Sequence, residues 1–378
     1  MATYKEQNKL NVPHLRFPEF EGEWEKCKLG YIATLTKGSG ISKDQRSATG
    51  TPCILYGELY TTYKSEVIDY VVSKTDISDK NLVRSCANDI IIPSSGETAI
   101  DISTARCVLS PDVLLGGDLN IIRLKDGDGR FFSYQLNGVR KHDIAKIAQG
   151  VSVVHLYGES LKGLTVSFPS NKEQQKISTL LSLIDERIAT QSKLIEKLES
   201  LIKGIAQKIV HSNKTNVRLS ECVECSSSTL QESDVCEHGA YPVYGANGIV
   251  GYLDNYNTEG EAVYIIKDGS GVGTVSYVTG KCSATGTLNT LQAKEGYSLQ
   301  YLYYLLKVFN FEPYKTGMAI PHIYFKDYGK AKFFCPSYTE QLQYAKSLSA
   351  IDSKLLVEKN ILTSLSMQKK YLLRQMFI

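Results

Sequence analysis

Four residues in the second half of the chain carry side chains that could bind zinc. Cys222 and Cys225 form a Cys-x-x-Cys pair, and Cys236 and His238 follow them. Thiolate and imidazole groups in such sets make structural zinc sites. Only one residue separates the closing pair, however, and VRLSECVECSS has the composition of a strand that opens a domain. We therefore predict no metal site, and we expect most of the nine cysteines to be small core residues of a reducing compartment.

A glycine-rich segment is the second candidate for chemistry. DGSGVGTV contains Gly269, Gly271 and Gly273, as a nucleotide-binding loop would. A phosphate site of this kind needs a helix N-terminus directly after the loop, but the following TVSYV is strand-like. The segment is therefore more typical of a β-turn, and we expect no cofactor to be bound by this chain.

Recognisable catalytic motifs are missing from the sequence. It contains no Gly-x-x-x-x-Gly-Lys-Ser/Thr loop, no Asn-Pro-Pro or Asp-Pro-Pro motif of amino-methyltransferases, no His-Glu-x-x-His and no Gly-x-Ser-x-Gly. His155 and His322 stand in VVHLY and IPHIY, where a lone histidine is more often structural than catalytic. We predict that the chain has no catalytic residue of its own.

Polar residues on glycine-rich segments offer a surface suited to recognition. Asn, Lys and Ser side chains on such loops can approach base edges or phosphates without steric obstruction. In the second half, the candidates are Tyr244, Gly245, Asn247, Gly248, Lys267, Asp268 and Ser270. A looser set in the first half comprises Lys37, Ser39, Lys43, Arg46, Tyr56, Ser94 and Ser95. The same residues also suit hairpin turns and strands, so composition leaves both interpretations open.

An internal repeat shows which elements must position these residues. Residues 150–210 return without a gap as residues 317–377, a shift of 167. Equivalent pairs include Gly150 and Gly317, His155 and His322, Pro169 and Pro336, Glu173 and Glu340, Gln174 and Gln341, and Asp185 and Asp352. The chain therefore consists of two similar halves.

The second part of each repeat has the heptad pattern of a coiled-coil helix. In the first copy the stripe is Ile177, Leu181, Ile184, Ile188, Gln191, Ile195, Leu198, Ile202, Ile205 and Ile209. In the second it is Tyr344, Leu348, Ile351, Leu355, Glu358, Leu362, Leu365, Leu372 and Met376, with Lys369 weakening the seam near its end. Gln191 and Glu358 interrupt the two stripes at the same layer, so a buried contact between them would set the register. That contact is expected whether the helices run parallel or antiparallel.

Both long helices are predicted to begin in the same way. Ser170 with Glu173, and Ser337 with Glu340, fit the Ser-x-x-Glu capping box. Before each helix, short apolar runs such as ANDIIIPSSG and EAVYIIKDGSG indicate strands, and FFSYQLNGVRKHDIAKIAQ and SLQYLYYLLKVFNFEPY indicate shorter helices. We therefore predict an α+β fold with two similar domains, each followed by a long helix.

Composition limits the broad class only loosely. The 378 residues suggest two or three domains, and 42% hydrophobic with 22% charged residues is ordinary for a globular protein. A formal net charge of +3 permits a nucleic-acid partner without indicating one. The sequence shows neither a signal peptide nor a run of 18 apolar residues, so we expect a cytoplasmic protein with no membrane partner.

Taken together, these motifs resemble one family, the specificity subunits of type I restriction–modification enzymes. The resemblance is carried by VPHLRFPEFEGEWEKCKLG, by YPVYGANGIVGYLD with IIKDGSGVG, and by the repeated PSNKEQQKISTLLSLID and PSYTEQLQYAKSLSAID. It implies two target-recognition domains that each read one half of a bipartite, asymmetric DNA site. It also implies that the long helices, each roughly 60 Å for about 40 residues, pair antiparallel as a spacer between the half-sites.

The resemblance also implies the partners of the chain. Two modification subunits would dock on it and methylate adenine with S-adenosylmethionine, and restriction subunits would cleave DNA with ATP and Mg, so these cofactors would belong to partner subunits. The expected segments are an N-terminal extension (1–19), recognition domain 1 (20–168), a central spacer helix (169–212), recognition domain 2 (213–335) and a C-terminal spacer helix (336–378). Domain 1 has no YGANG-like loop, and TPCILYGELYTTY matches it only loosely.

Two other classes of function are compatible with parts of the sequence. A non-catalytic scaffold could use the coil for assembly and the two domains to bind proteins, as a near-neutral net charge permits. A stand-alone nuclease or methyltransferase is disfavoured by the missing motifs. A neighbouring gene with an Asn-Pro-Pro-Tyr/Phe motif would favour the restriction–modification function over the scaffold.

Overall fold

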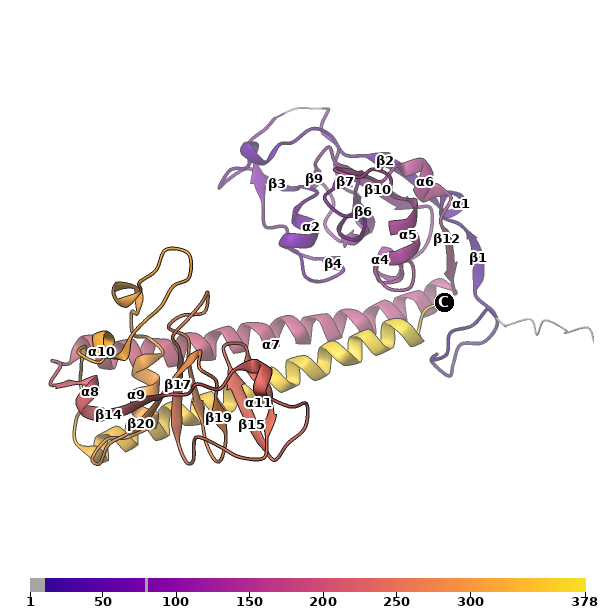
Figure 1. Ribbon diagram of the computed structural model, residues 1–378. Helices are drawn as coiled ribbons and strands as arrows, with labels where there is room; N and C mark the ends of the chain where they lie inside the picture. Colours follow the sequence, from indigo (N-terminus) through magenta and orange to yellow (C-terminus); the bar gives the residue numbers. More distant parts are fainter. Residues whose placement is uncertain (1–10, 79–80) are drawn as a thin grey trace, which may run out of the picture. The chain divides into compact units, whose positions relative to one another are not determined.

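The computed structural model describes residues 11–78 and 81–378, which form two compact units (Figure 1). Unit 1 comprises Met1–Thr190 and Leu362–Ile378, and unit 2 comprises Gln191–Ile361. The boundary cuts through both long helices, α7 (Asn171–Ser212) and α11 (Tyr338–Gln375). Each unit therefore contains one globular α+β domain and a part of each helix.

Unit 1 is built on a five-stranded sheet in the order β2-β10-β6-β8-β4. Its strands are β2 (Ala33–Lys37), β4 (Val67–Ile68), β6 (Asp89–Pro93), β8 (Arg106–Val108) and β10 (Leu119–Leu124). All five residues of β6 are buried, because DIIIP lies in the middle of the sheet with both faces covered. Only β4 pairs in parallel, with β8.

Smaller sheets and short helices complete unit 1. The remaining strands are β1 (Glu25–Lys28), β3 (Thr51–Ile54), β5 (Lys74–Thr75), β7 (Ser95–Gly96), β9 (Leu114–Leu115), β11 (Val154–His155) and β12 (Thr165–Phe168). The helices are α1 (Leu29–Ile32), α2 (Glu58–Thr61), α3 (Ala99–Ile102), α4 (Gly129–Asn137), α5 (Lys141–Ile147), α6 (Gly158–Lys162) and the 3-10 turn η1 (Lys43–Gln45). The predicted helical stretch before α7 is confirmed as α4 and α5.

The end of the chain completes the core of unit 1. Met376 and Phe377, which follow α11, are buried with Trp24 and Phe131, and the Phe377 ring lies 5.1 Å from that of Phe131. At the other end, the Leu15 amide donates to the Gln375 carbonyl at 2.9 Å. The described part of the predicted N-terminal extension is therefore packed onto the domain.

Unit 2 repeats this architecture with fewer strands. Its main sheet has the order β14-β20-β17-β18 and lacks a counterpart of β4 among the described residues. The strands are β13 (Val217–Arg218), β14 (Val223–Ser227), β15 (Tyr241–Gly245), β16 (Gly248–Leu253), β17 (Ala262–Ile266), β18 (Val275–Val278), β19 (Ser283–Ala284), β20 (Leu288–Ala293) and β21 (Lys332–Phe333). The helices are α8 (Leu219–Cys222), α9 (Leu299–Leu306), α10 (Phe325–Tyr328) and the 3-10 turns η2 (Glu232–Asp234) and η3 (Glu312–Tyr314).

Strand register extends the internal repeat beyond the part found from the sequence. β2 pairs with β10 as β14 pairs with β20, so that Lys37 opposite Asn120 corresponds to Ser227 opposite Asn289. The shift is 190 from Lys37 to Ser227 and 169 from Asn120 to Asn289, whereas it is 167 in the repeat found from the sequence. The prediction that VRLSECVECSS forms one strand is wrong, because α8 separates β13 from β14 just as α1 separates β1 from β2.

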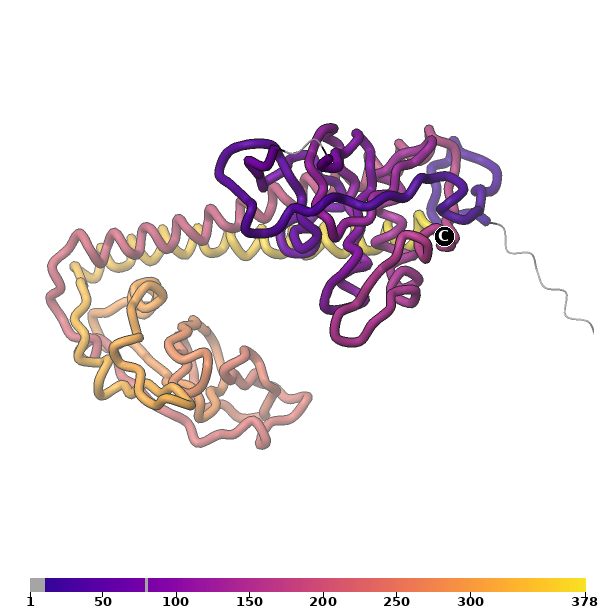
Figure 2. Tube along the Cα trace, turned by 90° about the horizontal axis from the view of Figure 1, so that it is seen from above, coloured from indigo at the N-terminus to yellow at the C-terminus, as the bar shows by residue number. Residues whose placement is uncertain are grey.

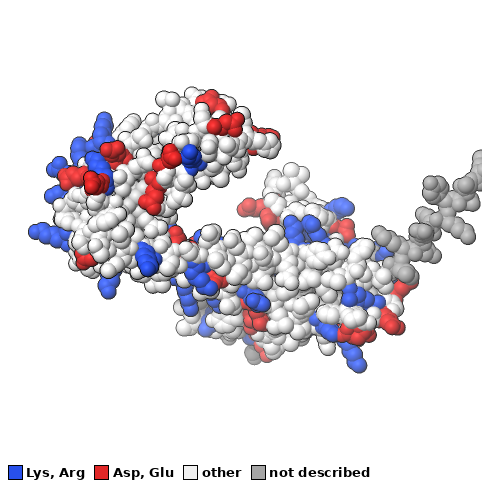
Figure 3. Space-filling model, turned by 90° about the horizontal axis from the view of Figure 1, so that it is seen from below, with Lys and Arg blue, Asp and Glu red and all other residues white. Residues whose placement is uncertain are grey.

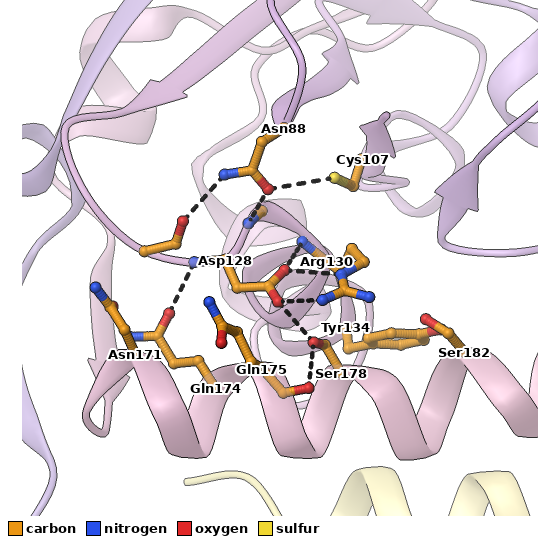
Figure 4. A network of polar contacts seen from close by, with 12 residues as sticks. Asn88, Cys107, Asp128, Arg130, Tyr134, Asn171, Gln174, Gln175, Ser178 and Ser182 are labelled. Atoms are coloured by element: carbon orange, nitrogen blue, oxygen red, sulfur yellow. Dashed lines mark hydrogen bonds and ion pairs between the residues drawn. The ribbon is translucent and has the colours of Figure 1, made fainter. Parts of the chain in front are cut away.

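The same residues fasten each domain to its long helix. In unit 1, Gln174 of α7 accepts from the Asp128 amide at 3.0 Å (Figure 4). It also donates to the Pro169 carbonyl at 2.8 Å. In unit 2, Gln341 of α11 accepts from the Ser298 amide at 2.9 Å and donates to the Pro336 carbonyl at 2.9 Å. The repeated glutamines therefore satisfy backbone groups that burial would otherwise leave unpaired.

A tyrosine–aspartate contact repeats in the same way about three turns farther along each long helix. In unit 1, the Tyr134 hydroxyl donates to Asp185 at 2.8 Å. In unit 2, the Tyr304 hydroxyl donates to Asp352 at 3.3 Å. Asp185 and Asp352 are equivalent under the shift of 167, which explains why both were visible in the repeat.

The two long helices pair antiparallel within each unit. In unit 1, Lys369 of α11 contacts Asp185 of α7 at 2.5 Å, and the two helix segments run side by side in both views (Figures 1 and 2). In unit 2, Gln191 donates to Glu358, and Lys359 lies 2.6 Å from Glu199. The direction follows from unit 1, where Ile177 and Leu181 pack in one core cluster with Leu372 and Met376, and the later Asp185 contacts the earlier Lys369. The predicted contact between Gln191 and Glu358 is confirmed.

Most residues of the predicted stripe are buried or half-buried. Its buried members are Ile177, Leu181, Ile184, Ile195, Ile202, Ile209, Leu348, Leu355, Glu358 and Met376, and Ile205 is half-buried. Its half-buried members are Ile188, Gln191, Leu198, Ile351, Leu362, Leu365 and Leu372. Tyr344 is 36% exposed, and the buried Ala345 lies beside it, so the placement of Tyr344 in the stripe is wrong.

Lys369 does not weaken the helix pair, as the sequence suggested. Its ammonium lies 2.5 Å from both Glu66 and Asp185, and its side chain is 14% exposed. Burial works against the ammonium, but the two carboxylates outweigh burial and raise the pKa of Lys369. The pair of helices therefore continues through this layer to the end of α11.

The two long helices do not begin by the same device. At α11 the capping box is present, because Glu340 accepts from the Ser337 amide at 3.1 Å and the Ser337 hydroxyl accepts from the Glu340 amide. At α7, Glu173 instead forms a two-pronged contact with Arg16, both at 2.8 Å. The capping-box prediction is confirmed for α11 and wrong for α7, because the Glu173 carboxylate accepts hydrogen bonds from Arg16 instead of from the helix start.

Candidate nucleic-acid interface

A cavity of about 760 Å³ opens on the globular domain of unit 1. It is lined by η1, by the start of α2 and by the turn before β10. Three predicted recognition residues, Lys43, Arg46 and Tyr56, meet there, and Arg46 lies 3.5 Å from the buried carboxylate of Glu58. Lys43 is exposed, so the cavity presents donors beside both polar and apolar lining residues.

The other predicted residues of unit 1 lie around this cavity rather than in it. Lys37 ends β2 and is exposed, whereas the Ser39 hydroxyl accepts from the Val83 amide at 2.7 Å and so holds a loop in place. Ser94 is buried, and its amide donates to the carbonyl of Asp118, a residue that lines the cavity. Ser39 and Ser94 therefore support the surface from within.

In unit 2, the glycine-rich recognition segment forms a hairpin. Gly245 of β15 pairs with Gly248 of β16, which leaves Ala246 and Asn247 as a two-residue turn. Asn247 is exposed at the tip, and Gly248 has φ +100°, a conformation that favours glycine. Asn247 is thus free to reach a partner from a rigid support.

Tyr244 and Gly245 lie below this tip. The Tyr244 ring is 5.6 Å from the buried ring of Tyr264 and packs on the core of the domain. Burial raises the pKa of Tyr244. A side chain at Gly245 would meet Val250 and Glu232. These two residues position the hairpin, and Asn247 is the one that projects.

A second loop of unit 2 carries the remaining candidates. It follows β17 and contains Lys267, Asp268 and the exposed Ser270, and Gly269 turns it with φ +95°. This confirms the expected β-turn in place of a nucleotide loop. Asp268 contacts Nδ1 of His322 at 2.7 Å. The hairpin and this loop are held by neighbouring residues, since Thr285 donates to Tyr244 and Lys267 donates to Thr287.

The candidate loops occupy equivalent places in the two domains. Ser94 follows β6 as Lys267 follows β17, and their carbonyls accept from Leu156 and Ile323, respectively. The parallel register of β3 with β9 and of β15 with β19, however, makes Ile54 rather than Tyr56 the counterpart of Tyr244. Sequence comparison missed this alignment because it depends on strand pairing, whereas the shared Tyr-Gly dipeptide suggested a register two residues away.

Sequence analysis also missed several residues of the unit 1 cavity. Gln45, Tyr60 and Asp118 line it together with the predicted Lys43 and Arg46. The one sequence signal was the Ser42–Gln45 spacing, since Ser42 and Gln45 exchange capping contacts in η1. A similar turn, η2, precedes β15 in unit 2.

The cysteine cluster does not form a zinc site. Cys222 lies 3.9 Å from Cys335, Cys225 is half-buried in β14, and Cys236 is exposed opposite Tyr252. Residues 11–78 and 81–378 contain no group of three or more potential metal ligands. All nine cysteines are free and five of them are buried, which agrees with the prediction that most are core residues.

One face of the molecule shows how charged side chains are distributed (Figure 3). On the face drawn in Figure 3, basic and acidic residues are interspersed among uncharged ones. A nucleic-acid contact on this face would therefore depend on individual loops rather than on a broad basic surface. None of the helices formed by the described residues combines the length and the apolar character of a membrane span.

The protein has two domains of one fold, and each domain presents polar loops and is fixed to one helix of an antiparallel pair. This arrangement is that of a recognition protein with two similar binding domains. The model for the type I restriction modification DNA specificity domain matches residues 21–200 and 211–367. The chain therefore belongs to this family and carries its domain twice. Members of the family supply specificity and are in general not catalytic, in agreement with the missing catalytic motifs.

Individual relatives agree with this assignment. A type I specificity subunit of Mycoplasma genitalium is 28% identical over 287 residues, which span 68% of this chain and 73% of that protein. The specificity subunit of the type I restriction enzyme MjaVIII of Methanocaldococcus jannaschii is 24% identical over 63% of this chain and 58% of its own length.

Solved structures share the fold. The crystal structure of the S subunit of a type I restriction-modification system from M. genitalium matches with a TM-score of 0.72 and 21% identity, covering 97% of this chain and 99% of that one. A chain from a structural study of complex assembly in a type I R-M system matches with a TM-score of 0.52 and 15% identity, over 93% of this chain and 96% of the other.

Proposed function

We propose that the chain is the DNA-reading subunit of a type I restriction–modification complex, in which each domain reads one half of a bipartite, asymmetric site. Residues 20–168 and 213–335 are the two recognition domains, and segments 169–212 and 336–378 form the spacer. Two modification subunits that methylate adenine dock on the chain, and restriction subunits join them. The cofactors of both reactions stay with those partners.

One observation carries this proposal. The loops after β6 and β17 stand at equivalent positions of the two domains, yet one presents Ser95 and the other presents Lys267 and Asp268. Two domains that read different base pairs need the same backbone arrangement with different side chains on the loops that approach the bases. A scaffold that binds one kind of protein twice would have no need for this difference.

The assignment of the second half-site is tested at the hairpin tip. In the assembled complex, Asn247→Ala should change or relax the second half of the methylated motif and leave the first half as it is. The matched change in domain 1 is Arg46→Ala, which should act on the first half alone. Methylation is mapped by single-molecule sequencing in cells that contain the modification subunit, and equal loss at both halves for either variant would reject the assignment.

The spacer role of the helices is tested by paired deletion. Removal of residues 187–193 and 357–363 takes one heptad from each helix and retains the tyrosine–aspartate contacts on either side. The helices become shorter by about 10 Å, or roughly three base pairs of DNA. The deletion variant should accept a shorter DNA spacer between unchanged half-sites. An unchanged DNA spacer would show that the helices do not set the distance between the half-sites.

A further inference from the structure

A small hairpin recurs in both domains at the shift of 167. Gln149 and His155 exchange two backbone hydrogen bonds of 2.9 and 2.7 Å, and Thr316 and His322 do the same at 2.9 and 2.7 Å. We call residues 149–155 and 316–322 the apolar hairpins. Each is closed by the same pair of bonds, so each presents its tip from a fixed base.

Glycine is required at the same point of both hairpins. Gly150 has φ +116° and Gly317 has φ +86°. A Cβ atom would lie 2.2 Å from the Val153 carbonyl oxygen in the first hairpin and 2.3 Å from that of Ile320 in the second. Both hairpins therefore have a tight turn that only glycine fits without strain.

The tips expose aliphatic side chains at matched positions. Val151 is 98% exposed and the equivalent Met318 is 105% exposed. Val153 and the equivalent Ile320 are exposed at 52% and 59%. Neither hairpin contains an Asp, Glu, Lys or Arg residue. Aliphatic side chains that stand in water at equivalent points of two domains indicate a partner that both domains meet.

Each apolar hairpin adjoins a candidate recognition loop. In domain 1, His155 pairs with Ser95, and in domain 2, His322 pairs with Asp268. The Gly269 amide also donates to the Pro321 carbonyl at 3.0 Å. Each tip therefore projects from the edge that we assign to DNA, beside the side chains that differ between the domains.

The chemistry of the tips selects one part of the duplex. Uncharged aliphatic groups have no attraction for phosphates, but they match the apolar faces of stacked bases. Architectural proteins insert Met, Ile and other apolar side chains between base steps, which unstacks and kinks the duplex. An enzyme that methylates a base must take that base out of the stack, whatever sequence surrounds it. This requirement is the same at both half-sites, as the hairpins are.

We propose that the two apolar hairpins are wedges that enter the duplex, one at each half-site, and unstack it next to the adenine that the modification subunit takes out. The inference rests on the proposed function and adds to it a sequence-independent step. The recognition loops read the bases, and Val151 with Val153, or Met318 with Ile320, open the stack.

The experiment uses the complete methyltransferase complex and a duplex that carries its mapped site with one strand already methylated, so that each half-site is followed separately. Met318→Ser with Ile320→Ser should slow methyl transfer in the second half-site at least tenfold and leave the first within twofold. Val151→Ser with Val153→Ser should do the reverse. Both pairs of side chains are exposed, so the fold is expected to be kept. Leu109→Ser, an exposed residue away from the hairpins, is the control and should not change either rate.

A mismatch opposite the target adenine distinguishes the wedge from other roles. Because a mismatched base is already partly unstacked, the defect of each variant should shrink to within about threefold on this substrate. A defect that persists on the mismatch and accompanies loss of the modification subunit on purification would overturn the proposal in favour of a protein-docking hairpin. Wild-type rates in the variants would also overturn it. Failure of the wild-type complex to methylate any site would reject the proposed function, and this inference with it.

Discussion

The contacts between each globular domain and the helix pair differ at one equivalent position, which carries a buried charge in unit 1 and a buried apolar side chain in unit 2, although the two domains share a fold. Lys369 in unit 1 lies between Asp185 of α7 and Glu66 of the globular domain. The equivalent position in the other helix is Ile202, which is 4% exposed in unit 2. Glu66 stands just before β4, the strand that unit 2 lacks. The segment that carries β4 therefore supplies the Glu66 carboxylate, which compensates the cost of burying the charge of Lys369.

Because of this difference, the helix pair has a charged layer in unit 1 at Lys369 and an apolar layer in unit 2 at Ile202. A buried lysine with two carboxylates accepts one partner surface, and an isoleucine accepts any apolar one. Two similar halves joined by similar helices could otherwise pair with the wrong register. We infer that the polar layers at Lys369 and at Gln191 with Glu358 favour one register over its neighbours.

The largest effect is expected from breaking the charged layer in unit 1. Lys369→Ala leaves Glu66 and Asp185 buried without their cation and should lower the stability of unit 1 by about 3–5 kcal/mol. Denaturant titration with hydrogen exchange locates the loss. The neighbouring Lys370 is exposed, and Lys370→Ala is the control, which should change stability by less than about 0.5 kcal/mol. Equal effects of the two variants would contradict the role of Lys369.

The next largest effect is expected at the glutamines that connect each domain to its long helix in the same way. Gln174→Ala and Gln341→Ala each leave a buried backbone amide and a carbonyl without a side-chain partner, and each should cost about 1–3 kcal/mol. The losses should be similar and confined to unit 1 and unit 2, respectively, as measured by hydrogen exchange at 128–137 and 298–306. A cost in only one unit would show that the two connections are not equivalent.

The helix starts offer a smaller and asymmetric effect. Ser337→Ala removes the hydroxyl cap of α11 and should cost about 1 kcal/mol. Ser170→Ala should cost less than about 0.5 kcal/mol, because Glu173 at that helix is engaged by Arg16. Thermal denaturation of the two variants beside wild type measures both. A larger loss for Ser170→Ala would mean that the α7 cap is stronger than its contacts indicate.

The smallest effect concerns acid stability. Hydrogen bonds from Lys354 and then from Gln191 lower the pKa of Glu358 below its ordinary 4.5. A carboxyl with a lowered pKa in the folded state stabilises the fold above its unfolded pKa, and the contribution is lost as pH falls through the folded value. The melting temperature of wild type should therefore drop more steeply below pH 4.5 than that of Glu358→Gln. Parallel curves would show that Glu358 adds no pH dependence.

Local and periodic features could be predicted from the sequence. The heptad stripes and the helices before α7 and α11 depend on residues near one another in the chain, and the structure confirms them except for Tyr344. The contact of Gln191 with Glu358 spans 167 residues, and the internal repeat revealed it. The duplication added a check, because each pattern appears twice.

Features that depend on distant partners could not be predicted in this way. Lys369 looked like a defect because Glu66 lies 303 residues away in the chain, and Arg16 takes Glu173 across 157 residues. In the candidate site, the equivalence of Ile54 and Tyr244 follows only from strand register. Exposure separates Asn247 from the residues that support it, and sequence composition does not contain that information.

The central claim is that this chain determines which DNA is methylated, through two domains that read separate half-sites. The most direct measurement maps methylated adenine by single-molecule sequencing in a strain with a verified active modification subunit, with and without this gene. The account predicts one bipartite motif, with two different halves and a fixed spacer, that is present with the gene and lost without it. Methylation that is the same in both strains would contradict the claim.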